Sequence, residues 1–328
     1  MSHNNRPGHY VSNDAVTLEN GNLRVVVLPE IGGRIWSIVY KPLNREILWH
    51  NPQIKPERHA LGTAFDDVWC GGWEEMFPTA APGTINQKLF PDHGEVWCLP
   101  WTAAAEESSG ADGLRLSCQA PLSGATVENV FRLRGDDARL EVTYTVTNMS
   151  KDELPFMFAL HPALAISGGE RIDFPAMSID VEPSYMGTLG GVAAPFAWPF
   201  ALRNGNPLDL RTVRSAGSKE VYFLYGHGYQ SGWCALTDRA ARLSTGFVFP
   251  PNVFRSCWLF ATYGGWRDYQ VVLLEPCTSH PQQIETAIEE DRVVLLAPGA
   301  SWRTAVTFLV QRGLSFVNGL TSDGRFRE

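Results

Sequence analysis

Short apolar runs rich in β-branched residues recur along the chain and determine its predicted secondary structure. The first run, Leu23–Leu28, is followed by a turn at Pro29–Gly33 and a second run at Arg34–Tyr40. Two such runs joined by a turn predict an antiparallel hairpin. Further along, Arg139–Thr147 alternates between apolar and polar residues, which is typical of a strand with one buried face.

Strands are predicted in most of the remaining chain. Pro162 interrupts the apolar run Leu154–Ile166, so this strand should bulge or end there. Only Gln282–Asp291 has a helical composition. The other predicted strands are Glu95–Trp101, Leu114–Ala120, Thr126–Arg134, Glu220–Tyr225, Gly232–Thr237, Ala241–Phe249, Cys257–Tyr263, Tyr269–Glu275, Arg292–Ala297 and Ser301–Gln311.

Segments without a clear period are expected to form loops, and the longest are Lys41–Ala64, Asp66–Thr79 and Met177–Ser218. The chain has no repeat of fixed period and no linker that would divide it. We therefore predict one domain spanning residues 1–328, all-β, with a large antiparallel sandwich and few short helices. Residues 1–14 are expected to form a poorly ordered N-terminal tail.

The composition fits a globular protein with a sizeable core, because 44% of the 328 residues are hydrophobic and 19% are charged. A net charge of −8 argues against nucleic acid or an anionic membrane as a partner. No apolar run has the length of a membrane helix, and the N-terminus has no apolar signal core. We expect a cytoplasmic protein that is a monomer or homodimer.

Six cysteines are scattered along the chain, and none forms a Cys-x-x-Cys pair. In a chain without an export signal, free buried thiols are the expected state, and a structural zinc site is not expected. Eleven tryptophans are many for this length. Their faces can stack on sugar rings, although core packing accounts for most of them.

Three residues are candidates for proton transfer. His93 lies in the mixed stretch Pro91–Trp101, where Gly94 breaks regular structure. His161 precedes Pro162, and Glu275 ends an apolar run, where a charge needs a partner or a function. Two histidines and a carboxylate suit general acid–base catalysis, and no serine or cysteine stands in a recognisable nucleophile motif.

The chain resembles the aldose 1-epimerase (galactose mutarotase) family over nearly its whole length, as a divergent branch. Two departures set it apart: the Asn-Arg pair of hexose-specific members is replaced by Gly72–Pro78, and no substrate-binding aspartate segment is evident near Asp238. The segments that carry the resemblance, in order, are Leu18–Ile35, Asp92–Glu95 with Trp97 and Trp101, His161-Pro162, Leu274–Pro276 and Leu296–Ser301.

The resemblance implies a β-supersandwich that interconverts the α and β anomers of a sugar without a cofactor. By resemblance, Glu275 takes the proton from the C1 hydroxyl, His161 donates a proton to the ring oxygen, and His93 steadies the developing charge. Glu74, Glu75 and Asp92 are candidates for binding sugar hydroxyls. Trp73 and Trp258 are candidates for stacking on the ring.

Three alternatives stay open. A sugar-phosphate mutarotase would need basic residues beside the site, and Arg34, Arg255 and Arg267 could contribute. A non-catalytic carbohydrate-binding protein and a polysaccharide lyase could use the same scaffold. His93 and Glu95 could form a metal pair, but we expect no metal, because two ligands fall short of the usual three and the reaction moves only protons.

Overall fold

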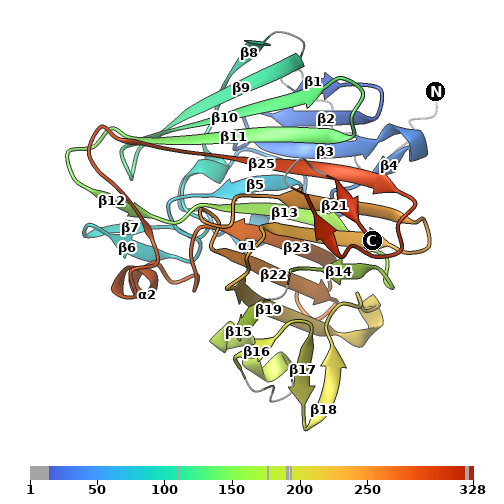
Figure 1. The fold of residues 1–328 in the computed structure, drawn as a ribbon. Coiled ribbons are helices and arrows are strands. Elements are labelled where there is room, and N and C mark those ends of the chain that lie inside the picture. Colours follow the sequence, from blue (N-terminus) through green and yellow to red (C-terminus); the bar gives the residue numbers. More distant parts are fainter. Residues whose placement is uncertain (1–14, 109–110, 176, 190–191, 193, 322–324) are drawn as a thin grey trace.

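The computed structural model describes residues 15–328, apart from 109–110, 176, 190–191, 193 and 322–324. The predicted N-terminal tail, residues 1–14, lies outside the described residues. Two large antiparallel sheets dominate the structure (Figure 1). One has 11 strands and the other has 8, counted over the described residues. This is the all-β architecture that the sequence predicted.

The larger sheet runs in the order β1-β2-β3-β5-β13-β23-β22-β19-β15-β16, with β4 paired to β3. Its strands are β1 (Val16–Glu19), β2 (Leu23–Leu28), β3 (Arg34–Tyr40), β4 (Arg45–Glu46), β5 (Trp73–Met76), β13 (Ala159–Ala165), β15 (Ser178–Val181), β16 (Phe196–Ala197), β19 (Glu220–His227), β22 (Ser256–Tyr263) and β23 (Gln270–Cys277).

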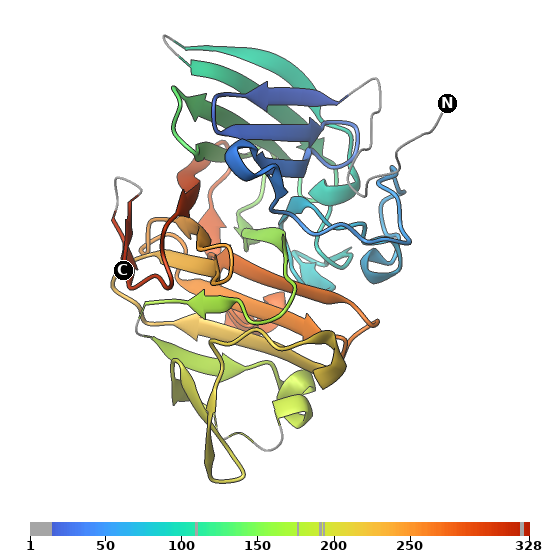
Figure 2. The same cartoon turned by 90° about the vertical axis from the view of Figure 1, so that its right-hand side faces the viewer.

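The second sheet runs in the order β14-β20-β21-β25-β11-β10-β9-β8. Its strands are β8 (Thr102–Ser108), β9 (Ala111–Ala120), β10 (Ala125–Arg134), β11 (Arg139–Asn148), β14 (Arg171–Asp173), β20 (Trp233–Asp238), β21 (Leu243–Val248) and β25 (Ser301–Arg312). In Figure 2 the N-terminal strands, in blue, lie in front of the strands of residues 102–148, in teal and green.

Four small hairpins and ladders complete the sheet structure: β6 (Gly83–Ile85) with β7 (Lys88–Phe90), β12 (Leu154–Phe156) with β24 (Val294–Leu296), β17 (Phe200–Arg203) with β18 (Asn206–Asp209), and β26 (Gly319–Leu320) with β27 (Phe326–Arg327). The helices are α1 (Phe65–Val68) and α2 (Ile284–Glu289), and 3-10 turns cover Lys41–Leu43, Val96–Cys98, Pro183–Leu189 and Ala216–Ser218. The β17–β18 hairpin lies at the opposite end of the molecule from β1 (Figure 1).

The core lies between the two large sheets. On β11, Leu140, Val142 and Tyr144 are fully buried, while the residues between them are only partly buried, as the alternating sequence predicted. Trp73 of β5 packs edge-on against Phe247 of β21, with the ring centroids 5.2 Å apart. The interior face of β5 therefore contacts the second sheet, and its other face is available for a site.

Most predicted strands appear with nearly the expected bounds, and four local predictions are wrong. Lys41–Ala64 is not a loop throughout, since it holds a 3-10 turn and β4. Glu95–Trp101 is not a strand, because Val96–Cys98 forms a 3-10 turn. Asp66–Thr79 is not a loop throughout, since it holds α1 and β5. Met177–Ser218 is not a loop throughout, since it contains β15. Pairing with β19 holds this strand in the sheet, although its sequence has no clear period.

Pro162 breaks one ladder of β13, as predicted. Ala159 and Ala163 pair with β23, whereas the residues between them do not. All six cysteines are free and buried, which confirms the expected thiol state. Within the part of the chain that the structure describes, no helix is both long and apolar enough to cross a bilayer.

Candidate active site

A row of residues crosses the larger sheet on the face that points away from the second sheet. His161 of β13 lies opposite Glu74 of β5. The β13–β23 pairs on either side of His161 place it level with Glu275, and Glu275 in turn lies opposite Trp258 of β22. Directly opposed residues of antiparallel strands project to the same face. The register thus brings together side chains that are far apart in the sequence.

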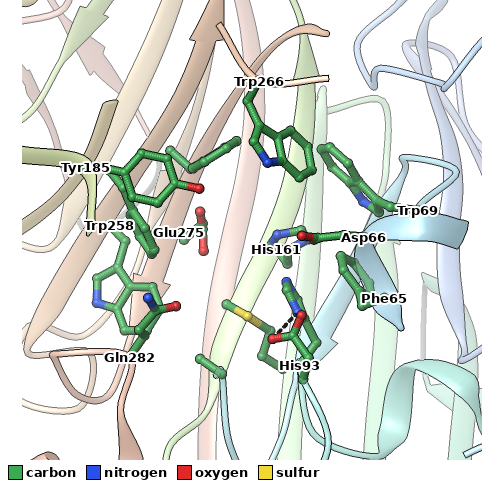
Figure 3. A pocket seen from close by; sticks show the side chains of 15 residues that line it. Phe65, Asp66, Trp69, His93, His161, Tyr185, Trp258, Trp266, Glu275 and Gln282 are labelled. Atoms are coloured by element: carbon green, nitrogen blue, oxygen red, sulfur yellow. Dashed lines mark ion pairs between the residues drawn. The ribbon is translucent and has the colours of Figure 1, made fainter. Parts of the chain in front are cut away.

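His161, Glu275 and His93 line one cavity of about 140 Å³ (Figure 3). Its walls are mostly aromatic, and Asp66, Asp92 and Gln282 add polar groups. The aromatic wall is formed by Phe65, Trp69, Tyr185, Phe223, Trp258, Phe260 and Trp266. This combination of apolar faces and a few converging polar groups is typical of a small-molecule site.

His93 reaches the cavity from a strained turn. Its φ is +60°, in the left-handed region, and Gly94 follows with φ +69°. A Cβ on Gly94 would come within 2.0 Å of the carbonyl oxygen of Phe77, so only glycine fits there. The His93 ring stacks on Phe65 at 3.6 Å and meets the edge of His161 at 4.8 Å. The turn therefore fixes the imidazole beside that of His161.

The charge of His93 is set by its neighbours. Burial lowers the pKa of His93, but Asp92, whose carboxylate lies 3.1 Å from Nδ1, and Asp66 outweigh this effect and the net pKa is raised. Burial raises the pKa of Asp66. The net pKa of His93 is thus raised by the acidic side chains around it, and that of Asp66 is raised by burial.

His161 is oriented by a buried carboxylate. Its Nδ1 lies 3.1 Å from Oε1 of Glu74, and Oε2 of Glu74 accepts a hydrogen bond from Arg34. Burial raises the pKa of Glu74, but Arg34 and His161 outweigh it, and the pKa is lowered. An ionised Glu74 fixes the proton of neutral His161 on Nδ1, which leaves Nε2 to exchange protons.

Glu275 differs from Glu74 in having no cation beside it. No hydrogen bond or ion pair joins its carboxyl group to any described residue, and the group faces the cavity (Figure 3). Burial, followed by the charge of Glu74, raises the pKa of Glu275 well above its usual range. Burial also lowers the pKa of His161. Both shifts favour the neutral forms of the pair.

Three of the predicted sugar-binding residues do not line the cavity. Trp73 is packed between the sheets, and Glu75 points to the same side, beside Tyr144. Glu74 lies on the cavity face but beneath His161, where it is fully buried. Successive strand residues face opposite ways, which explains why Glu74 and Glu75 separate. Of the predicted binding residues, Asp92 and Trp258 do line the cavity.

Several lining residues were not predicted. Asp66 and Trp69 belong to a segment that the sequence predicts to be a loop, although it holds α1, and Tyr185 lies in a segment without periodicity. Of the basic residues proposed for a phosphate site, Arg34 binds Glu74, Arg267 binds Asp67, and Arg255 bonds backbone carbonyls. None of the three lines the cavity.

Glu95 does not pair with His93. Its two carboxylate oxygens accept hydrogen bonds from the backbone N–H groups of Leu122 and Ser123, at 2.7 and 2.9 Å. The side chain is fully buried, and it anchors the turn that follows His93 to the β9–β10 connection. Glu95 therefore points away from His93, and the two residues do not form the metal pair that their spacing alone would allow.

Comparisons with known proteins identify the fold. A domain of unknown function (DUF5107) matches residues 2–88. A protein of Synechocystis sp. PCC 6803 superimposes with a TM-score of 0.68 at 16% identity, over 95% of this chain and 100% of its own. A candidate aldose 1-epimerase from Klebsiella pneumoniae superimposes with 0.71 at 15% identity, over 91% and 79%.

A galactose mutarotase-like protein from Lactobacillus casei gives a TM-score of 0.63 at 17% identity, over 90% of this chain and 100% of its own. At these identities the likeness shows the fold. The chain has the β-sandwich of galactose mutarotase-like proteins, which confirms the expected fold class.

Proposed function

We propose that the protein is an aldose 1-epimerase that opens and recloses the ring of a small sugar by acid–base catalysis. The observation that carries the proposal is the meeting of Glu275, His161 and His93, from three distant segments, in one aromatic-walled cavity. Aromatic faces suit the C–H faces of a sugar ring, and the carboxyl groups of Asp66 and Asp92 suit its hydroxyls.

In the proposed reaction Glu275 removes the proton from the C1 hydroxyl while His161 protonates the ring oxygen. The ring opens, the aldehyde rotates about C1–C2, and reclosure gives the other anomer with the proton movements reversed. Glu74 holds His161 through Nδ1, so that Nε2 faces the sugar. His93 hydrogen-bonds near the reacting oxygen. Each acid or base contributes typically about 10²–10⁴-fold to the rate.

The Glu275–His161 pair has to hold one proton for this chemistry. Ring opening in the proposed reaction uses the form with Glu275 ionised and the proton on Nε2 of His161. The raised pKa of Glu275 and the lowered pKa of His161 favour the other placement, with the proton on Glu275, so the reactive form is the less populated of the two one-proton forms. The rate should fall at low pH, where the pair takes a second proton, and at high pH, where it loses its only one. The two limits belong to the pair as a whole.

A sugar phosphate is the weaker candidate substrate. No Lys or Arg is among the described residues that line the cavity, whereas Asp66, Asp92 and Glu275 are. Burial raises the pKa of Asp92, but His93 outweighs burial and the net pKa is lowered, so the Asp92 carboxylate repels a phosphate, and an anion would lack the charged donors that normally bind it. These residues favour an uncharged aldose.

The decisive test is NMR saturation transfer between the two anomers, measured across common aldoses, sugar acids and sugar phosphates with the full-length protein. A faster exchange for at least one uncharged aldose, absent with Glu275→Gln, is the expected result. Binding of a sugar without any acceleration would instead identify a carbohydrate-binding protein. Cleavage of a polysaccharide with formation of a double bond would identify a lyase.

A further inference from the structure

Three side chains of types that can ligate a metal ion lie together on the same face of the larger sheet, outside the cavity. The row of opposed residues continues beyond Trp258 to Tyr225 of β19 and then to Asp180 of β15. His227, two residues after Tyr225, projects to the same face as Asp180, and its Nε2 lies 3.0 Å from Oδ2 of Asp180. His280, from the segment after β23, stacks on His227 at 4.7 Å.

We propose that Asp180, His227 and His280 bind a divalent transition-metal ion of the zinc class. One potential ligand atom from each residue lies within 4.8 Å of the other two. Two imidazoles and a carboxylate form a ligand set that suits Zn²⁺, with a water molecule in the fourth position. Among the described residues this is the one group of three or more such side chains.

The state of His280 supports this assignment independently. The residue is only 8% exposed, yet both of its ring nitrogens are buried without a hydrogen-bond partner among the described residues. Buried polar groups nearly always have a partner, and an exception calls for a water or an ion. A metal ion bound through one nitrogen would satisfy this imidazole.

The two histidine rings are nearly parallel, at 14°, so one of them has to turn before both can point at one ion. Turning the His280 ring would break no described hydrogen bond. The nearby Arg292 pairs with Glu290 at 3.1 Å, which offsets its positive charge. Binding at this site therefore requires a rotation of one imidazole ring.

An ion at this position would brace the wall of the catalytic cavity. The residue before His280, Ser279, accepts a hydrogen bond from Nε1 of Trp258 at 3.0 Å. Two residues after His280, the N–H of Gln282 donates to the hydroxyl of Tyr225 at 3.3 Å. Trp258 and Gln282 both line the cavity. We assign the ion a structural role, separate from proton transfer.

The test uses the full-length protein without a histidine tag, stripped with a chelator and dialysed. Calorimetric titration with Zn²⁺ should give one ion per chain, and Co²⁺ should give a visible absorption band. Mutating a residue that only hydrogen-bonds to a metal ligand typically weakens metal binding about 10–100-fold. His280→Ala removes a ligand itself, so it should weaken binding at least as much. Asp180→Asn should also weaken Zn²⁺ binding. Because Asp180 is partly exposed, this variant should stay folded and keeps the test valid if His280→Ala misfolds.

His59→Ala is the matched control, since it removes a partly buried histidine outside the cluster. It should bind Zn²⁺ as the unchanged protein does. Absence of saturable binding to the unchanged protein would overturn the proposal. So would full affinity in Asp180→Asn together with folded His280→Ala, because the ion would then sit elsewhere. None of these outcomes depends on whether the protein anomerises sugars.

Discussion

Glu74 and Glu75 are neighbours on β5, and both are buried, but they face opposite sides of the sheet. Glu74 faces Arg34 and His161 on the cavity side, and its pKa is lowered despite burial. Glu75 points into the core between the sheets, where burial and the charge of Glu74 raise its pKa to about 8. Burial alone disfavours a charge, and a cation nearby decides whether the charge survives.

The comparison extends to the catalytic carboxyl group. Glu275 shares the cavity face with Glu74, yet it has no cation beside it and its pKa is raised like that of Glu75. The cavity face therefore holds two carboxyl groups in different states. Glu74 is ionised and positions a histidine, whereas Glu275 is able to exchange a proton. The four predictions below test whether the two faces of β5 and the two carboxyl groups of the cavity differ in this way.

The largest effect is expected for Glu275→Gln. The amide keeps the shape but cannot accept a proton, so the anomerisation rate should fall by about 10²–10⁴-fold. The melting temperature at pH 7 should rise. Burial raises the pKa of Glu275, so at pH 7 the unfolded chain is favoured because it can release a proton that the folded state retains, and the amide removes this effect. Saturation-transfer NMR and thermal unfolding measure the two effects. An unchanged rate on a confirmed substrate would exclude Glu275 as the base.

His161→Asn should lower kcat by about 100-fold, at the lower end of the range for an acid–base group, because His93 remains in the cavity. KM should change little, since the proton donor is used mainly in the transition state. The measurement is the exchange rate over a range of sugar concentrations. A rise in KM with unchanged kcat would assign His161 to binding.

Glu74→Gln should lower kcat by about 10-fold or more, although Glu74 does not line the cavity. The variant loses the carboxylate that fixes the proton of His161 on Nδ1, and it leaves Arg34 buried without its anionic partner. The acid limb of the pH profile should shift as well, which a purely structural effect would not cause. Identical profiles for the variant and the unchanged protein would contradict a positioning role.

Much of the fold could be predicted because strand periodicity is a local property. Runs such as Leu23–Leu28 and Arg34–Tyr40 coincide with β2 and β3. The errors fall where long-range contacts override the local pattern. Glu95–Trp101 suggests a strand, but the carboxylate of Glu95 binds the backbone of Leu122 and Ser123, and Val96–Cys98 forms a 3-10 turn.

The site was predictable in part for the same reason. The catalytic candidates were identified by motif resemblance, and the sheet register then explains how His161 and Glu275 meet. The side on which Trp73, Glu74 and Glu75 project depends on how β5 is placed in the sheet, and the sequence showed no strand there. Asp66 was missed because a four-residue helix leaves almost no periodic signal.

The smallest effect on catalysis, and the sharpest test of the comparison, is expected for Glu75→Gln. This substitution is chemically identical to Glu74→Gln and lies one residue away, but it should leave the anomerisation rate unchanged. It should stabilise the fold at pH 7, because the folded state holds the pKa of Glu75 at about 8 instead of its ordinary value of 4.5.

The direction of this change in stability follows from proton linkage. Between pH 4.5 and about 8 the folded protein keeps a proton on Glu75 that the unfolded chain releases, so the free energy of unfolding decreases as the pH rises through this window. At about 1.4 kcal/mol per pKa unit, the loss at pH 7 is ~3 kcal/mol at most. Glu75→Gln should remove that slope and match the unchanged protein at pH 4. Denaturant unfolding at several pH values measures it, and parallel curves for both proteins would show that Glu75 is not buried in the neutral form.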